Sequence, residues 1–147
     1  MTELEMLMRV VVAALLGAAI GFDREARHKP AGMRTHMLVA SGSALAVAAS
    51  ALVIEDLRGT GFAGDPTRVA AGVLTGVGFL GAGAIIIGAE RVQGLTTAAG
   101  IWVTAAVGIT VGYGLFVLSI GATVITMIVV AVLIRIPVPG GDGQPPS

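Results

Sequence analysis

The side chains of this chain that could do chemistry are few, and they fall between long apolar runs, where helix ends are expected. This polar set consists of Arg9, Arg24, Glu25, Arg34, Thr35, Asp65, Arg68, Thr96 and Thr97. A hard cation such as Mg²⁺ prefers carboxylate oxygens and retained waters, so Asp65 and Glu25 are the candidate ligands. A structural network of ion pairs explains the same residues equally well, and the identity of any bound cation stays open.

Other kinds of chemistry find less support in the sequence. His28 and His36 are separated by a proline and a glycine and do not have the spacing of metal ligands on one helix face. The absence of cysteine excludes thiolate chemistry, and no Ser/His/Asp grouping is placed for nucleophilic catalysis. The Gly76-x-Gly78-x-x-Gly81 pattern matches a dinucleotide fingerprint but lacks the strand that must precede it. We therefore expect neither an enzyme nor a resident cofactor.

The composition indicates a membrane protein. Hydrophobic residues make up 55% of the chain, charged residues only 12%, and the mean hydropathy is +0.92. Such values lie above those of ordinary soluble domains. Nine basic and nine acidic residues cancel, so no overall field would attract nucleic acid. Glu3 and Glu5 stand where a signal peptide would be basic, which favours a first membrane helix over a cleaved leader.

The elements that must position the polar set are five apolar spans in one domain of residues 1–136. They are predicted at residues 4–22, 37–54, 67–87, 95–112 and 115–134, followed by a flexible Pro/Gly tail at 137–147. A soluble helical bundle would need amphipathic polar faces that these spans lack. The basic loop 23–36 is expected on the cytoplasmic side and the acidic loop 55–65 outside. The fold class is thus an all-α membrane protein with its N-terminus outside and its C-terminus cytoplasmic.

Small residues recur at helical spacing in several spans and predict helix-packing faces. These glycines are Gly17, Gly21, Gly72, Gly76, Gly78, Gly81, Gly83, Gly100 and Gly108. In the third span, Gly72, Gly76 and Gly83 share one face, while Gly78 and Gly81 lie nearly opposite. A helix that is small on two sides is expected between two neighbours, so we predict that the Gly-rich third helix is central.

Two further interpretations concern single residues. Arg9 lies inside the first span, and an ion pair with Glu5 one turn earlier is the preferred explanation over a functional role. Asp65 and Pro66 predict a helix start, because aspartate caps backbone N–H groups and proline fits the first helical position.

The two predicted cytoplasmic turns resemble each other weakly. Residues 21–24 (GFDR) parallel residues 88–91 (GAER), and residues 32–35 (GMRT) parallel residues 94–97 (GLTT). We therefore expect the first and second helical hairpins to superpose about an axis along the membrane normal.

Three blocks of sequence resemble the signature blocks of the MgtC/SapB family of bacterial inner-membrane proteins. They are GFDREARHKPAGMRTHMLVASGSAL, DPTRVAAGVLTGVGFLGAGAII and GLTTAAGIWVTAAVG. The resemblance implies a five-helix N-terminal domain and marks Arg24, Glu25, Gly32, Arg34, Thr35, Asp65, Arg68, Gly81, Gly94, Thr96, Thr97 and Trp102 as functional. This chain departs from many members in having Asp23 for glutamate and Gly72 for glutamine, and in ending without an ACT-type C-terminal domain.

The resemblance implies a role in adaptation to low magnesium and in virulence, as a regulator that binds other membrane complexes such as ATP synthase. Our leading hypothesis is a non-enzymatic protein that associates through helices with itself, as a homodimer or larger homo-oligomer, or with such a complex. Leucine at Gly76 or Gly100 would then abolish association. The alternative is a small Mg²⁺-linked channel or carrier, with a pathway between the third and fourth helices lined by Thr96, Thr97, Thr104 and Asp65. A third hypothesis is a site for anionic lipid or a small molecule at the basic loop.

Overall fold

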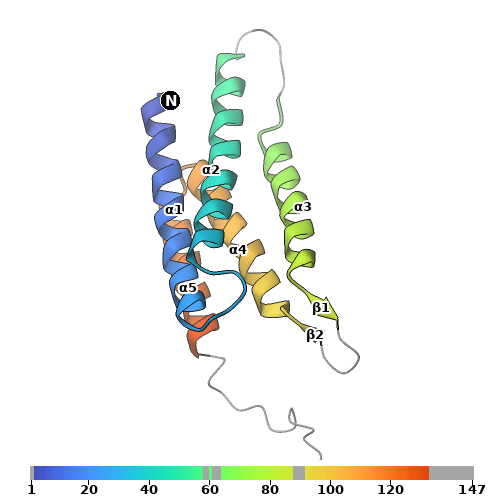
Figure 1. The fold of residues 1–147 in the computed structure, drawn as a ribbon. Helices are drawn as coiled ribbons and strands as arrows, with labels where there is room; N and C mark the ends of the chain where they lie inside the picture. The colour runs from blue at the N-terminus through green and yellow to red at the C-terminus, as the bar shows by residue number, and fades with distance from the viewer. Residues whose placement is uncertain (1, 58–59, 61–63, 88–91, 133–147) are drawn as a thin grey trace, which may run out of the picture.

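The computed structural model describes residues 2–57, 60, 64–87 and 92–132, and it shows five helices and one short strand pair in this part of the chain (Figure 1). The helices are α1 (Glu3–Ala26), α2 (Met33–Asp56), α3 (Thr67–Gly83), α4 (Leu95–Gly112) and α5 (Phe116–Val132). Strands β1 (Ile86–Ile87) and β2 (Val92–Gln93) pair antiparallel between α3 and α4. The predicted all-helical class with five helices is confirmed.

Helix lengths agree with a bilayer. Helices α1, α2 and α4 are long and apolar enough to cross a membrane, and α3 and α5 are shorter apolar helices of 17 residues. At ~1.5 Å per residue, such a helix rises roughly 26 Å, slightly less than the hydrocarbon core. Large apolar side chains such as Leu15, Leu38 and Val117 cover the outside of the bundle.

The first polar loop is shorter than predicted because its ends belong to helices. Helix α1 continues to Ala26, and α2 begins at Met33 rather than at residue 37. His28, with φ of 53°, ends α1 in a Schellman arrangement, in which the Lys29 N–H donates to the Arg24 carbonyl. The Glu25 carboxylate accepts from the Met33 N–H at 2.7 Å and so caps α2.

The third helix also differs from the prediction. It ends at Gly83 rather than at residue 87, because Ile86 and Ile87 pair with Gln93 and Val92 in the strand hairpin. Residues 88–91 of the predicted turn, the fifth span beyond Val132 and the predicted tail 137–147 lie outside the described residues. Both α2 and α4 follow a glycine N-cap, Gly32 and Gly94, as the proposed repeat requires. The superposition of the two hairpins stays a prediction.

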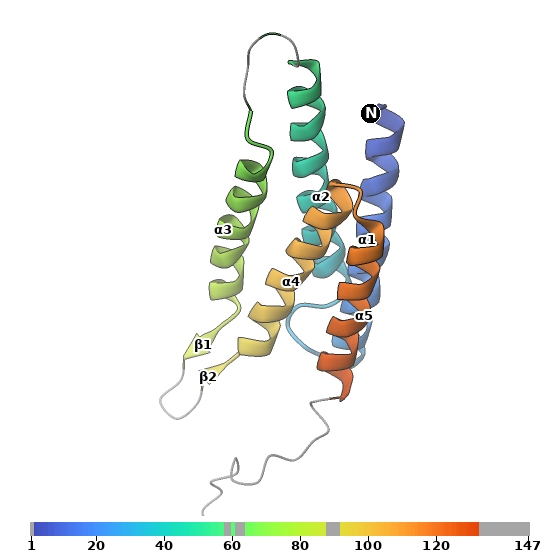
Figure 2. The ribbon, with the colours of Figure 1, turned by 180° about the vertical axis from the view of Figure 1, so that it is seen from behind.

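The central position belongs to α4, not to the Gly-rich third helix. Helix α4 packs against all four other helices, whereas α3 lies at one edge and packs mainly on α4 (Figure 2). Small and β-branched residues of α4 form its core contacts, with Ala105 and Ile101 against Val77 and with Val111 against Ala13 and Ala44. A helix with small residues all around can be surrounded closely by neighbours, and here that helix is α4.

Glycine positions in α1 and α4 are filled by α2. A Cβ atom on Gly17 would lie 2.5 Å from the His36 carbonyl oxygen, and one on Gly21 would lie 2.5 Å from Met33 Cα. A Cβ on Gly108 would collide with the Ala40 carbonyl oxygen. These glycines allow backbones to approach more closely than any side chain would permit.

Candidate functional site

The core of the bundle contains a buried arginine. Arg24 is 2% exposed, although it lies near the end of α1, and its Nη2 donates to Thr97 Oγ1 of α4 at 2.6 Å. Its Nε has no hydrogen-bond partner among the described residues. Arg24 is buried because it follows Gly17 and Gly21 on the face of α1 that packs inward.

A second polar pair joins α2 to α4. His36, in the first turn of α2, is fully buried, with Nδ1 2.7 Å from Thr104 Oγ1. The Thr104 hydroxyl donates its own proton to the Gly100 carbonyl at 2.8 Å, so it accepts from the histidine. Nδ1 therefore carries a proton, and Nε2 is buried without a partner in the described chain. Gly100 packs beside this ring, where an added Cβ would lie at an ordinary contact distance of 3.5 Å from His36 Cε1.

The two candidate carboxylate ligands for a cation are apart and engaged. Glu25 caps α2 through Met33 at the end of the bundle where the α1–α2 loop lies, and Asp65 precedes α3 at the other end (Figure 1). Asp65 Oδ1 accepts from the Thr67 hydroxyl at 2.7 Å and from its N–H at 2.8 Å. These bonds, the hydroxyl bond first, lower the pKa of Asp65. Within the described residues no group of three or more Asp, Glu, His or Cys side chains could hold a metal ion.

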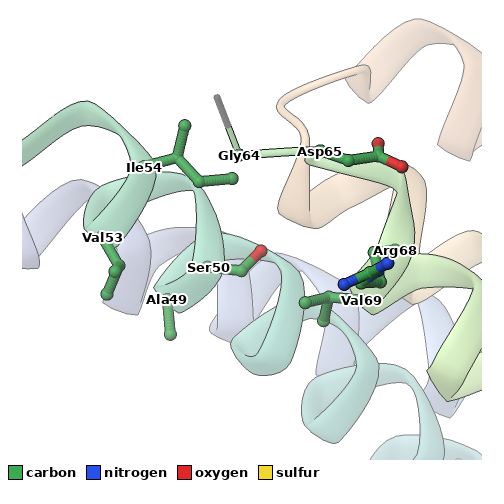
Figure 3. A pocket seen from close by; sticks show the side chains of 8 residues that line it. All are labelled: Ala49, Ser50, Val53, Ile54, Gly64, Asp65, Arg68 and Val69. Atoms are coloured by element: carbon green, nitrogen blue, oxygen red, sulfur yellow. The ribbon is translucent and has the colours of Figure 1, made fainter. Parts of the chain in front are cut away.

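Asp65 and Arg68 border a cavity of about 560 Å³ between α2 and α3, with Ser50 of α2 on its other side (Figure 3). Asp65 and Arg68 are both exposed. Tyr113, at the end of α4, donates its hydroxyl to the Pro66 carbonyl at 2.6 Å and so ties the start of α3 to α4. Partial burial raises the pKa of Tyr113.

Arg9 does not pair with Glu5, so that prediction is wrong. Its Nη1 donates at 2.7 Å to the carbonyl of Gly112, the last residue of α4. Glu5 instead forms a capping box with Thr2 at the start of α1. The carbonyl end of a helix is unpaired and carries partial negative charge, which explains the preference of Arg9 for α4.

The remaining predicted residues lie at the surface or partly buried. Arg34 and Thr96 are exposed, Thr35 is half-buried, and Trp102 is 45% exposed on the outer side of α4. The predicted cation pathway between α3 and α4 is not assembled, because Thr97 and Thr104 bond to residues of α1 and α2. Asp65, another residue of the predicted pathway, precedes the start of α3, whereas Thr97 lies in the first turn of α4, which follows the other end of α3.

The polar set proposed from the sequence includes neither His36 nor Lys29, although both lie in the basic loop that was considered as a site for an anionic lipid or small molecule. A signal for His36 was present, since His36, Ala40, Ser43, Ala44 and Val47 follow a helical period and form the buried face of α2. The position of Lys29 depends on the left-handed residue before it, and no pattern in the sequence predicts that conformation at a histidine.

An apolar helical bundle with large apolar residues on its outside and its few charges near the helix ends is a helical membrane protein. More specifically, the chain belongs to the MgtC family, whose model matches residues 10–137. The resemblance seen in the sequence is thereby confirmed.

Curated relatives support the same assignment. The chain is 46% identical over 129 residues to "Putative magnesium transporter YhiD" of Escherichia coli strain K12, covering 87% of this chain and 60% of that protein. It is 48% identical over 121 residues to "Protein MgtC" of Brucella abortus strain 2308, covering 82% of this chain and 48% of the relative. For "Protein MgtC" of Salmonella typhimurium strain LT2 the identity is 39%, with 82% and 49% covered. The chain thus spans about half of these relatives, and no solved structure matches it.

Proposed function

We propose that this chain is a non-enzymatic membrane protein that acts by lateral association with a second copy of itself through the open glycine face of α3. This face is defined by Gly72, Gly76 and Gly83, where an added Cβ would meet nothing within 4 Å. The opposite side of α3, with Val77 and Gly81, is the side that packs on α4. An edge helix with one face filled and the opposite face open is placed to receive a neighbour.

The chemistry of this face favours another copy of the same helix. Gly72 and Gly76 form a GxxxG pattern within an apolar helix, and this pattern lets two helices approach to backbone contact in lipid. No charged side chain lies between Val69 and Gly83, so a symmetric pairing brings no like charges together. Close packing of backbones then replaces contacts with lipid.

For the physiological role, we propose adaptation to low magnesium in the bacterial inner membrane, with multiple spans and the basic α1–α2 loop in the cytoplasm. Two observations support this role, namely membership of the MgtC family and the magnesium-related name of the Escherichia coli relative. A regulated complex such as ATP synthase is the alternative occupant of the α3 face. The carrier alternative has less support, because the Arg24 cation lies at Thr97, on the route that a metal ion would take.

The decisive experiment replaces one open glycine on α3 and one elsewhere. Gly76→Leu should weaken dimerisation at least about tenfold, because the side chain holds the two helix backbones apart. Gly121→Leu on α5 is the matched control, since an added Cβ there also meets nothing within 4 Å. Dimer fractions are measured by single-molecule photobleaching in liposomes. Gly100→Leu is no longer informative, because Gly100 packs inside the chain against His36.

A Gly76→Leu protein that dimerises like the wild type would refute this interface. Wild-type protein that is monomeric alone but recovered with one membrane complex, with Gly76→Leu abolishing recovery, would assign the face to that partner. Growth at low Mg²⁺ of a bacterial strain lacking its own MgtC-family protein tests the role, with the same two variants. Mg²⁺ flux into proteoliposomes that is unaffected by Gly76→Leu would instead support the carrier.

A further inference from the structure

A second cavity lies at the end of the bundle that carries the α1–α2 loop. It has a volume of about 490 Å³ and is bounded by that loop, by the strand hairpin and by the first turn of α4. Figure 2 shows the hairpin directly beside the start of α4. Arg24 and Lys29 both line this cavity, and none of the lining residues that the structure describes is acidic.

Arg24 lines this cavity, and its buried guanidinium has a donor without a partner in the described chain. Arg24 is 2% exposed and lines the cavity wall beside Thr97. In the described part of the chain, its Nη2 donates to Thr97 Oγ1, while its Nε is buried without a hydrogen-bond partner. A buried cation with an unpaired donor is costly unless an anion compensates it. Arginine is also the side chain whose fork best matches oxyanions.

The start of α4 provides a second feature that favours an anion. Helix α4 has 18 residues, and its N-cap residue Gly94 supplies no side-chain cap. The first N–H groups of a helix point outward, and the macrodipole adds partial positive charge there. Gly94 has φ of 88°, and a Cβ there would collide with the Ala84 carbonyl oxygen, so glycine allows the α3 end to close against α4. Residues Leu95, Thr96 and Thr97 of this first turn line the cavity.

Lys29 completes a cluster of positive charge whose acidic neighbours are engaged elsewhere. The Schellman bond from the Lys29 N–H to the Arg24 carbonyl fixes the lysine backbone beside Arg24. Asp23 forms an ion pair with Arg27 at 2.9 Å, and Glu25 caps Met33. Neither of these two carboxylates lines the cavity.

We propose that this cavity binds a phosphate group, held by Arg24, Lys29 and the first turn of α4. Helix N-termini with an adjacent arginine and lysine recur in phosphate sites. The group belongs either to inorganic phosphate in solution or to the headgroup of an anionic lipid. Ile86, Val92 and Leu95 give the same cavity an apolar side, which would contact the glycerol and acyl portion in the lipid case. This site does not depend on association through α3.

The test compares two exposed cations near the same loop. Lys29 lines the cavity, whereas Arg34 is exposed and does not line it. Full-length protein in an uncharged detergent is titrated with inorganic phosphate by calorimetry. Phosphatidylglycerol binding, against phosphatidylcholine, is measured by native mass spectrometry. Lys29→Gln should weaken binding of the recognised ligand roughly three- to tenfold, and Arg34→Gln should leave it within about twofold.

Testing inorganic phosphate and phosphatidylglycerol separately distinguishes a free phosphate ion from a lipid headgroup as the source of the bound phosphate group. Phosphate binding that Lys29→Gln weakens assigns the site to the free anion, and selective retention of phosphatidylglycerol that the same variant weakens assigns it to lipid. Arg24→Gln should reduce binding by more than about tenfold, with the folded state checked by thermal unfolding. If that variant does not fold, the comparison of Lys29→Gln with Arg34→Gln decides. Absence of binding to both ligands, or equal losses in these two variants, would overturn the proposal.

Discussion

Glycines of similar spacing have opposite surroundings in two regions of this bundle. In α1 and α4, the space that a side chain would take is occupied by the backbone of α2, as at Gly17 and Gly108. In α3, the space beside Gly72, Gly76 and Gly78 is open. The first group explains how three helices pack within one chain. The second group has no such explanation within the described chain, and this contrast is the basis for proposing an intermolecular interface.

The largest effect that tests this contrast is expected from leucine at a filled position. Gly108→Leu forces a branched side chain into the Ala40 carbonyl and the Ser43 side chain. Overpacking of this kind costs about 1–3 kcal/mol when neighbours can shift, and backbone atoms shift least. We therefore expect little or no folded Gly108→Leu protein by size-exclusion chromatography in detergent.

Gly76→Leu provides the comparison for that result. It should elute as a folded protein with a wild-type circular dichroism spectrum, because its space is open within the chain. Equal losses of folded protein in both variants would show that α3 is packed on both faces, and the contrast would be wrong.

Alanine substitutions test the same contrast more finely. Gly17→Ala places a Cβ against the His36 carbonyl and should destabilise the protein by about 1–3 kcal/mol. Gly78→Ala adds the same atom in open space away from the face proposed for association, where better helix propensity should stabilise the protein by up to about 1 kcal/mol. The midpoint of thermal unfolding in detergent measures both changes. Shifts of the same sign in both variants would contradict the different environments.

The helices and their buried faces could be predicted from sequence, but not which faces meet. Periodicity places Gly72, Gly76 and Gly83 on one side of α3 and Gly78 and Gly81 nearly opposite. The space beside the first three is open and Gly81 faces Ala98 of α4, as expected, but the space beside Gly78 is open as well. Nothing in that pattern says that α4 covers only the Gly81 side, because this depends on contacts between residues distant in the chain. The central place was therefore given to α3, although α4 occupies it.

The candidate site shows the same limit. Arg24, Thr97, Glu25 and Asp65 were identified as polar residues at helix ends. The partners of the polar residues were not predicted correctly. Arg9, for example, bonds to Gly112 and not to nearby Glu5. A local ion pair is the simplest reading of a sequence, while an unpaired carbonyl at the end of a distant helix has no signature in it. The buried His36–Thr104 pair likewise required the packing of α2 on α4.

The polar contact in the tightly packed region should matter more than a similar threonine on α3. Thr104→Val removes the acceptor for His36 Nδ1–H and leaves a buried donor unpaired, which costs about 1–3 kcal/mol. Thr75→Val on α3 is the matched control, because both hydroxyls donate to the carbonyl four residues earlier and Thr75 is exposed. Thermal unfolding should fall clearly for the first variant and remain near wild type for the second. Equal midpoints would mean that the histidine contact contributes nothing beyond packing.

The smallest effect concerns the attachment of α3 to the rest of the bundle. Tyr113→Phe removes only the hydroxyl that donates to the Pro66 carbonyl at 2.6 Å, a bond worth about 0.5–1.5 kcal/mol. Because α3 packs mainly on α4, this loss should increase the local opening of α3 more than that of α1, α2 or α4. Hydrogen exchange followed by mass spectrometry should show faster exchange in peptides from residues 67–83 and unchanged exchange in residues 33–56. Faster exchange throughout the bundle would show that α3 opens together with the other helices and is not a separately held edge.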